Sequence, residues 1–276
     1  MPLDLIRRQR RASTGRESPR AWREGIAAPA LKRAFLHATA GRLAIHLVLI
    51  AAVPPVFGQA SRAPAGRDAL AGYFSPSRAE EIALARSAAP APVSSAADVL
   101  VLEPEGYARA VAGTNGFVCL VERSWNTSFD DPEFWNPRVR APNCYNRAGA
   151  RSVLPAYLMR TGWALDGLGA PEIESHLRDA VATGRVTDPE AGAMSYMTSR
   201  DSHLSDAAGH AHPHLMFYLP RTEPGAWGAN VHGGLVSADQ GAPEPMTVFF
   251  VPVPRWSDGG RVDEPAHDAG DATHQP

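Results

Sequence analysis

Apolar residues recur at every second position or run together in the segment that starts at Asp98 and reads DVLVLEPEGYARAVAGTNGFVCLVERSW. Such patterns are typical of β-strands, whose side chains point alternately to the two faces of a sheet. A Glu-Pro-Glu-Gly stretch interrupts the run, and the Asn-Gly pair in GTNG favours a turn with positive φ. The segment therefore predicts three antiparallel strands, near residues 98–103, 106–112 and 117–123.

Helical periodicity with matching end signals is found in three other segments. Ser77 and Glu80 stand at capping-box spacing ahead of a short apolar stripe, which predicts a helix near 78–88. Two more helices are expected, one capped by Ser152 with Pro155 in its first turn and one from Pro171 to Gly184.

Apolar runs at 192–199, 214–220 and 246–253 predict further strands, and the last of them should be central in the sheet. Residues 124–150 are interrupted by prolines, and residues 221–245 are rich in glycine, so irregular structure is expected in both. The order of strands, helices and strands favours a single α+β domain, with an antiparallel sheet and its helices packed on one face.

An apolar run at 43–53, LAIHLVLIAAV, has the length of the hydrophobic core of a signal peptide and follows basic residues. Small residues at Gly58 and Ala60 predict cleavage after Ala60. The alternative is an uncut membrane anchor, against which the prolines directly after the run argue. The long basic stretch ahead of the run indicates either a wrongly chosen start codon or a disordered arm. The predicted organisation is a leader and signal peptide at 1–60, a linker at 61–76, the α+β domain at 77–256 and a disordered tail at 257–276.

Export of this kind places the mature chain in the periplasm or outside the cell, with no stable membrane span after cleavage. Cys119 and Cys144, the two cysteines of the chain, fit an oxidising compartment and are expected to form a disulfide. A free catalytic thiol is the alternative.

Charge is distributed unevenly along the chain. Residues 1–60 hold 10 of the 27 Lys and Arg residues but only 3 of the 29 Asp and Glu residues, so the predicted domain is acidic. An acidic surface argues against nucleic acid as a partner. Lys32 is the only lysine, which excludes a Schiff-base or P-loop lysine from the mature chain.

Three histidines alternate in GHAHPHLMFYLP, residues 209–220. Residues two apart on a strand share a face at about 6.5 to 7 Å, so His210 with His212, or His212 with His214, suits a zinc or copper ion. His203 is a candidate for a further ligand, alongside His232, Asp201 and Asp206. The alternative is a polar turn, with His214 packed against the sheet, and a His-rich tract alone is only compositional evidence.

Two other kinds of site are weaker candidates. A metal-free hydrolase would combine one of these histidines with Ser195, Ser199 or Ser202, but the chain has no G-x-S-x-G elbow. Aromatic residues at 125–135 would line a ligand groove, or else cover the edge of the core.

The stretches ARSAAPAPVSSAADVLVL, GTNGFVCLVERSW, ARSVLPAYL, GAMSYM, GHAHPHLMFYLP and MTVFFVPVPRWSDG together resemble a family of uncharacterised bacterial proteins with export signals. The resemblance covers most of 77–260 and implies an exported bacterial protein, without residue roles. Two function classes stay open at this point. One is a His-centred, metal-binding or catalytic site, and the other is a non-catalytic envelope or ligand-binding protein with structural histidines.

Overall fold

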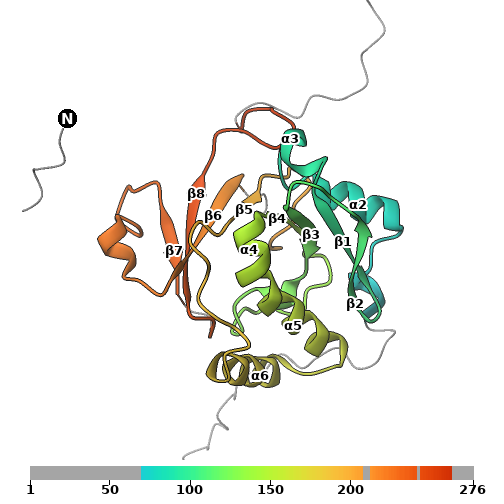
Figure 1. Cartoon of the computed structure of the whole chain (residues 1–276), viewed down its shortest axis with the longest axis horizontal. Helices are drawn as coiled ribbons and strands as arrows, with labels where there is room; N and C mark the ends of the chain where they lie inside the picture. Colours follow the sequence, from blue (N-terminus) through green and yellow to red (C-terminus); the bar gives the residue numbers. More distant parts are fainter. Residues whose placement is uncertain (1–69, 208–211, 241–242, 263–276) are drawn as a thin grey trace, which may run out of the picture. The chain divides into compact units, whose positions relative to one another are not determined.

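The computed structural model describes residues 70–207, 212–240 and 243–262. These residues belong to one compact unit within 56–276, and their strands form one eight-stranded sheet in the order β2-β1-β3-β4-β5-β6-β8-β7 (Figure 1). Neighbouring strands in this sheet are antiparallel, apart from β1 and β3. The strands are β1 (Asp98–Glu103), β2 (Gly106–Val111), β3 (Val118–Glu122), β4 (Ala141–Tyr145), β5 (Met194–Met197), β6 (His214–Pro220), β7 (Ser237–Asp239) and β8 (Met246–Pro252). The expected α+β class with a mostly antiparallel sheet is confirmed.

Two helices begin at side-chain caps, but the expected cap at Ser152 is wrong: Ser152 ends the helix Arg147–Ser152, and the helix Leu154–Leu165 follows Val153 without a side-chain cap. The Ser77 hydroxyl accepts a hydrogen bond from the Glu80 amide, and the Asn146 side chain accepts one from the Gly149 amide. Satisfying amides of the first turn in this way stabilises a helix start by about 1 kcal/mol. The helices are η1 (Ala71–Tyr73), α2 (Arg78–Arg86), α3 (Ala91–Ser94), η2 (Ser124–Asn126), α4 (Arg147–Ser152), α5 (Leu154–Leu165), α6 (Ala170–Ala182) and η3 (Pro224–Trp227).

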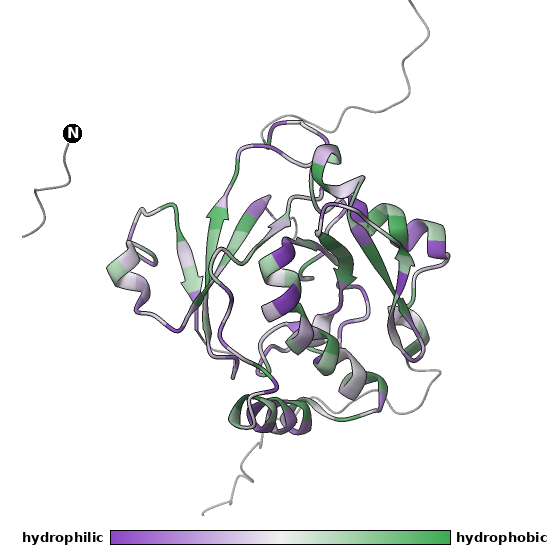
Figure 2. Ribbon diagram, in the orientation of Figure 1, coloured by the Kyte–Doolittle hydropathy of each residue, from purple (hydrophilic) through white to green (hydrophobic). Residues whose placement is uncertain are grey.

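Both faces of the sheet carry helices. On the inner face, Leu120 and Tyr145 pack with Leu154 at the start of α5, and α4 and α5 cross this face (Figure 1). On the outer face, Val99 and Cys119 pack against α2. β3 and β8 are mainly hydrophobic in Figure 2, whereas α4 exposes hydrophilic residues. Burial on two faces explains why these strands read as continuous apolar runs. The terms inner face and outer face are kept below.

The first three strands do not form the antiparallel meander that the Asn-Gly turn predicts. β1 and β2 are antiparallel, but β3 lies on the other side of β1 and runs parallel to it. After β2 the chain crosses the start of β1, where the Thr114 amide donates to the Ala96 carbonyl at 2.8 Å. A Cβ at Gly113 would lie 2.2 Å from the Asp98 nitrogen, so this crossing requires glycine. Because of this crossing, β3 lies between β1 and β4 in the interior of the sheet. Its side chains are mainly apolar on both faces.

A disulfide joins Cys119 and Cys144, as predicted. The two cysteines lie directly opposite each other on β3 and β4, and both are fully buried on the outer face. They are 25 residues apart in sequence, and closing a loop of that length stabilises the folded state by about 3 kcal/mol in the chain-entropy model. β4 itself lies in the 124–150 segment that was expected to be irregular.

Ordered structure extends beyond the predicted domain bounds of 77–256. Leu70 and Tyr73, from the expected linker, are buried in the core. Past residue 256 the chain folds back onto the domain, where Asp258 pairs with Arg200 at 2.7 Å. The predicted leader, signal peptide and cleavage after Ala60 lie outside the described residues. In the described part of the chain, no helix is both long and apolar enough to span a bilayer.

Candidate functional site

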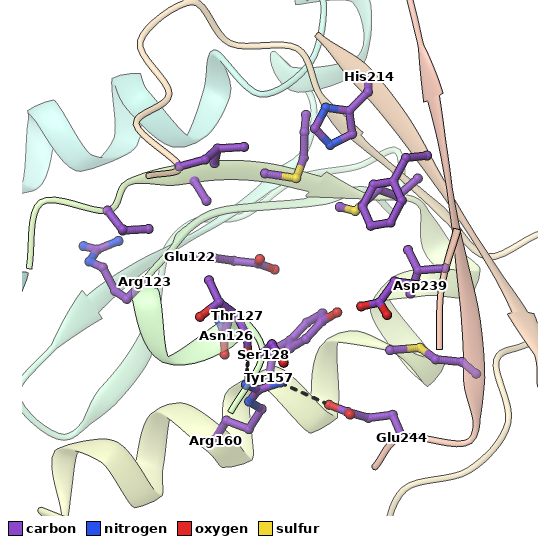
Figure 3. Close-up of a pocket in the computed structure, with 18 residues that line it drawn as sticks. Glu122, Arg123, Asn126, Thr127, Ser128, Tyr157, Arg160, His214, Asp239 and Glu244 are labelled. Carbon is purple, nitrogen blue, oxygen red and sulfur yellow. Dashed lines mark hydrogen bonds and ion pairs between the residues drawn. The ribbon is translucent and has the colours of Figure 1, made fainter. Parts of the chain in front are cut away.

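A pocket of about 340 Å³ opens on the inner face of the sheet, beside α5 (Figure 3). Its volume falls at the small end of the range of about 300 to 1,000 Å³ that is typical of small-molecule sites. The strands β3 to β8 contribute one wall, α5 contributes Tyr157 and Arg160, and the segment after η2 contributes Thr127 and Ser128.

Most of the pocket wall is apolar and adaptable. Three of its side chains are methionines, which are flexible and fit irregular ligands well. The apolar lining consists of Val139, Ala141, Met197, Leu204, Met216, Met246, Val248 and Phe250.

Glu122, at the end of β3, supplies an acidic group to this apolar wall. Only 7% of the residue is exposed, and its Oε1 accepts hydrogen bonds from the Tyr145 hydroxyl at 2.5 Å and the Asn143 amide at 3.1 Å. Desolvation raises the pKa of Glu122 to about 7, although these hydrogen bonds and the charge of Arg160 act in the opposite direction. The other oxygen, Oε2, accepts no hydrogen bond from the described part of the chain.

Tyrosines surround this carboxyl. Tyr145 packs between Tyr157 and Tyr218, with ring centroids 6.1 Å and 5.9 Å away, and the Tyr218 hydroxyl lies 2.9 Å from the Ser195 hydroxyl. Burial raises the pKa of Tyr145, Tyr157 and Tyr218 above the usual value. The phenols therefore stay protonated at neutral pH and act as hydrogen-bond donors.

Arg160 and Glu244 form the second polar group of the pocket. The Arg160 guanidinium donates to the backbone carbonyls of Trp125 and Thr127 and lies 3.5 Å from Glu244 Oε1, while its face covers the Phe129 ring. The Glu244 side chain is 2% exposed, yet its Oε2 has no hydrogen-bond partner among the described residues. A buried carboxylate oxygen without a partner is costly and is expected to meet a ligand or water.

The predicted histidine ligands are only partly brought together. His214 lines the pocket, with Nδ1 2.8 Å from the His212 carbonyl and its ring against Phe250. Burial lowers the pKa of His214, so its imidazole is neutral at pH 7. His203 instead pairs with Asp206 at 2.7 Å. His210 lies outside the described residues.

No group of three or more His, Cys, Asp or Glu residues suited to a metal ion occurs in the portion of the chain that the structure describes. The His-centred zinc or copper site stays a prediction that depends on His210. Of the predicted nucleophiles, Ser195 bonds to Tyr218 and Ser199 to Ser87, which leaves neither paired with a described histidine.

The aromatic segment at 125–135 belongs to the core. Trp125 and Phe134 are fully buried and pack with Tyr73, while the Trp125 indole donates to the Thr161 hydroxyl. The groove that these residues were considered to line is therefore not formed by them, and the alternative of a covered core edge holds.

Sequence reasoning missed the polar groups of the pocket. Glu122 ends an apolar strand, and its side chain points to the same face of the sheet as that of Leu120, two residues earlier. Arg160 follows Tyr157 by three residues and so lies on the same side of α5. In both cases the available signal was a charged residue at a position where the periodic pattern of the element expects a buried apolar residue.

Comparisons of the chain with protein-family models, with curated proteins and with solved structures found no match. The pocket is therefore the basis for the functional proposal.

Proposed function

We propose that this protein works outside the cytoplasm and binds a small molecule in the pocket beside α5. The observation that carries the proposal is the Glu122 carboxyl, which is buried in an apolar wall and whose Oε2 accepts no hydrogen bond from the described residues. Burying a carboxyl in apolar surroundings lowers stability unless the group is compensated. A ligand that binds to this carboxyl accounts for its presence.

The distribution of polar groups supports binding over a purely structural role. Glu122, Arg160 and Glu244 gather at the pocket, while methionine, valine and phenylalanine side chains form the rest of its wall. An apolar cavity with a few convergent polar groups is the usual design of a small-molecule site, in which the polar groups orient the ligand.

The extracytoplasmic location is supported by two features. The buried Cys119–Cys144 disulfide is compatible with an oxidising compartment, where such bonds persist. The apolar run at 43–53, with its basic flank and the small residues before Ser61, has the pattern of a cleavable export signal. The resemblance to exported bacterial proteins agrees with this location.

A second candidate function is proton transfer to or from the bound molecule. It is favoured by the pKa of about 7 at Glu122, because a general acid or base works best when its pKa lies near the working pH. In this case Tyr145 would orient the carboxyl through its hydrogen bond to Oε1. Turnover of a bound compound, lost in Glu122→Gln, separates an enzyme from a binding protein.

Native mass spectrometry of the exported protein, purified without unfolding, tests the proposal. Val248 lines the pocket and is only half-buried, so Val248→Trp fills the cavity without entering the deep core. Leu235→Trp is the matched control, because Leu235 is 83% exposed. We expect a small molecule to accompany the wild type and Leu235→Trp, and to be lost from Val248→Trp. A ligand-free wild type, or equal occupancy of the two variants, contradicts the proposal.

A further inference from the structure

We infer that the ligand carries an uncharged primary carboxamide, which pairs with the side-chain amide of Asn126 and donates a further hydrogen bond to Glu122. This inference rests on the proposed function and adds the chemical class of the ligand. It depends on the hydrogen-bonding positions that the protein leaves open at the pocket and on the rigid support of Asn126.

Asn126 lines the pocket with the hydrogen-bonding capacity of its side chain unused (Figure 3). Its Nδ2 and Oδ1 are both shielded from solvent, and neither has a hydrogen-bond partner among the described residues. A side-chain amide offers two donors on its nitrogen and two acceptor positions on its oxygen. Leaving such a buried group unpaired lowers stability, and a ligand that meets both atoms removes this cost.

The protein holds the backbone on both sides of Asn126. The Arg160 guanidinium donates to the carbonyls of Trp125 and Thr127, the residues directly before and after it. The backbone N–H of Asn126 donates to the Arg123 carbonyl at 3.0 Å. The residue is therefore preorganised, and only its side-chain amide, which rotates about a soft χ2 torsion, has to turn toward a ligand.

The two hydroxyls that follow Asn126 on the pocket lining are already used by the protein. Thr127 Oγ1 donates to the Ser124 carbonyl at 2.7 Å, and the Ser128 hydroxyl donates to Asp130. Within the stretch 126–128, the Asn126 amide is therefore the group that is available to a bound molecule.

Two carboxyl oxygens add further acceptors to the pocket. Glu122 Oε2 accepts no hydrogen bond from the described residues, and Glu244 Oε2 has no partner among them either. In the view of Figure 3, Asn126 lies between Glu122 and Arg160. The open positions at the pocket are thus one amide, with donors and an acceptor, and additional acceptors near it.

A primary carboxamide matches this pattern of donors and acceptors. Its carbonyl accepts from Asn126 Nδ2, one N–H donates to Asn126 Oδ1, and the second N–H is left for Glu122 Oε2. Asparagine binds adenine through the same kind of paired contact, in which one amide donates and accepts at once. A carboxylate or a ketone has no donor for the protein oxygens, and an ammonium group has no acceptor for Nδ2. The methionine and valine wall suits an apolar body on the carboxamide.

Isothermal titration at pH 8 with three matched series of compounds tests the inference, on protein that is dialysed until native mass spectrometry detects no ligand. Carboxamides, methyl ketones and carboxylates have nearly the same shape. Each is used with n-pentyl, cyclohexylmethyl and 2-phenylethyl bodies at up to about 5 mM, which reveals a millimolar Kd. At this pH the Glu122 carboxyl is mostly ionised and therefore an acceptor. We expect the best carboxamide to bind at least about tenfold more tightly than the ketone with the same body, and the carboxylates not to bind.

Asn126→Leu provides the residue-level test, because leucine has nearly the same size but no hydrogen-bonding atom. It should weaken carboxamide binding by at least about tenfold and remove the preference over the ketone. Its midpoint of urea unfolding without ligand should equal or exceed that of the wild type, because no side-chain hydrogen bond to the described residues is lost.

Asn136→Leu is the matched control. The Asn136 amide donates to Glu133 and Asp206 at 2.9 and 2.8 Å, so this substitution should lower the unfolding midpoint and leave carboxamide binding unchanged. Val248→Trp, which fills the cavity, should abolish carboxamide binding.

The possible failures are distinct. If ketones or carboxylates bind as tightly as the carboxamides, or if Asn126→Leu keeps the preference, the carboxamide inference is wrong and the binding function stands. An unfolding midpoint of Asn126→Leu below that of the wild type would also overturn the inference, because the amide would then be structural. If no compound of any series binds, the inference is wrong, and the binding function is wrong as well when the wild type as purified carries no small molecule.

Discussion

The Tyr145 hydroxyl donates a 2.5 Å hydrogen bond to Glu122 Oε1, from the neighbouring strand and within the buried inner face of the sheet. The residue of β4 that pairs with Glu122 is at one end of that strand, and Tyr145 is at the other end. The 2.5 Å hydrogen bond therefore runs diagonally from one strand to the other. This bond lowers the pKa of Glu122 against the stronger effect of desolvation. Burial and the bond from Tyr145 therefore decide together how far Glu122 is ionised near neutral pH.

Glu122 should make the stability of the protein depend on pH. Its folded-state pKa of about 7 lies above the ordinary value of 4.5, so the unfolded chain loses this proton first as the pH rises. Stability from this group is present in full below pH 4.5 and is lost as the pH rises through 7, by a total of about 3 kcal/mol. Arg160, Asp239 and Glu244 also face the Glu122 carboxyl, and their charges influence how much stability is lost as the pH rises.

Urea unfolding of the disulfide-intact protein from pH 4 to pH 8 measures this dependence. Glu122→Gln should become more stable relative to the wild type as the pH rises, since glutamine does not ionise. Glu105→Gln, at an exposed turn between β1 and β2, is the control and should follow the wild type at every pH. A constant difference between Glu122→Gln and the wild type over the whole range would show that the carboxyl is not perturbed by burial.

Tyr145→Phe should raise the pKa of Glu122 further, because it removes a hydrogen bond that favours the ionised form. The stability loss with rising pH should then extend to higher pH than in the wild type. Tyr157→Phe is the matched control, since Tyr157 packs on Tyr145 without a hydrogen bond to Glu122. ¹³C NMR titration of the Glu122 carboxyl measures the shift. Equal effects of the two substitutions would argue against a specific role for Tyr145.

The buried ion pair between Arg123 and Glu81 should be far more important for stability than an exposed pair. The side chains are 0% and 3% exposed, so Glu81→Gln leaves a buried guanidinium without its counter-charge and should cost about 3 to 5 kcal/mol. Glu103→Gln removes the partner of Arg78 in an exposed pair and should cost less than about 1 kcal/mol. Urea unfolding compares them, and similar losses would contradict this assignment.

Removing the disulfide should lower the free energy of unfolding by about 3 kcal/mol. The expectation follows from the 25-residue separation of Cys119 and Cys144. Thermal unfolding of the wild type and of Cys119→Ala/Cys144→Ala measures the loss, and thiol titration of the native wild type without reductant should detect no free thiol. Two titratable thiols in the native protein would show that the bond does not form in the cell.

Several elements were predictable because their signals are local. The apolar run at 214–220 is β6 within the same bounds, and Ser77 caps α2 as its spacing to Glu80 indicates. The pairing of Cys119 with Cys144 followed from the count of two cysteines in an export-type chain. In each case a short stretch or a residue count contains the necessary information.

Other elements depend on contacts between distant parts of the chain. β4 includes Pro142, which argued against a strand, yet β5 pairs with β4 only at Cys144 and Tyr145. Pro142 lies outside that pairing, so its missing amide hydrogen costs no bond to β5. The parallel pairing of β3 with β1 likewise depends on the crossing at Gly113, which no periodicity reveals.

The candidate site was the hardest part to predict. Glu122, Arg160 and Glu244 are far apart in sequence and meet only because β3, α5 and the segment before β8 surround one cavity. Periodicity identifies which face a residue occupies but not which element covers it. The histidine cluster was more conspicuous in the sequence, yet only His214 of the described histidines lies on the pocket.

The crystal structure of the protein, purified without added ligand and without unfolding, tests the central claim most directly. We expect electron density for an organic molecule in the cavity between the inner face and α5, within hydrogen-bond distance of Glu122 Oε2. A cavity that holds only ordered water, in a protein that also yields no small molecule on denaturation, would contradict the claim that this pocket is a binding site.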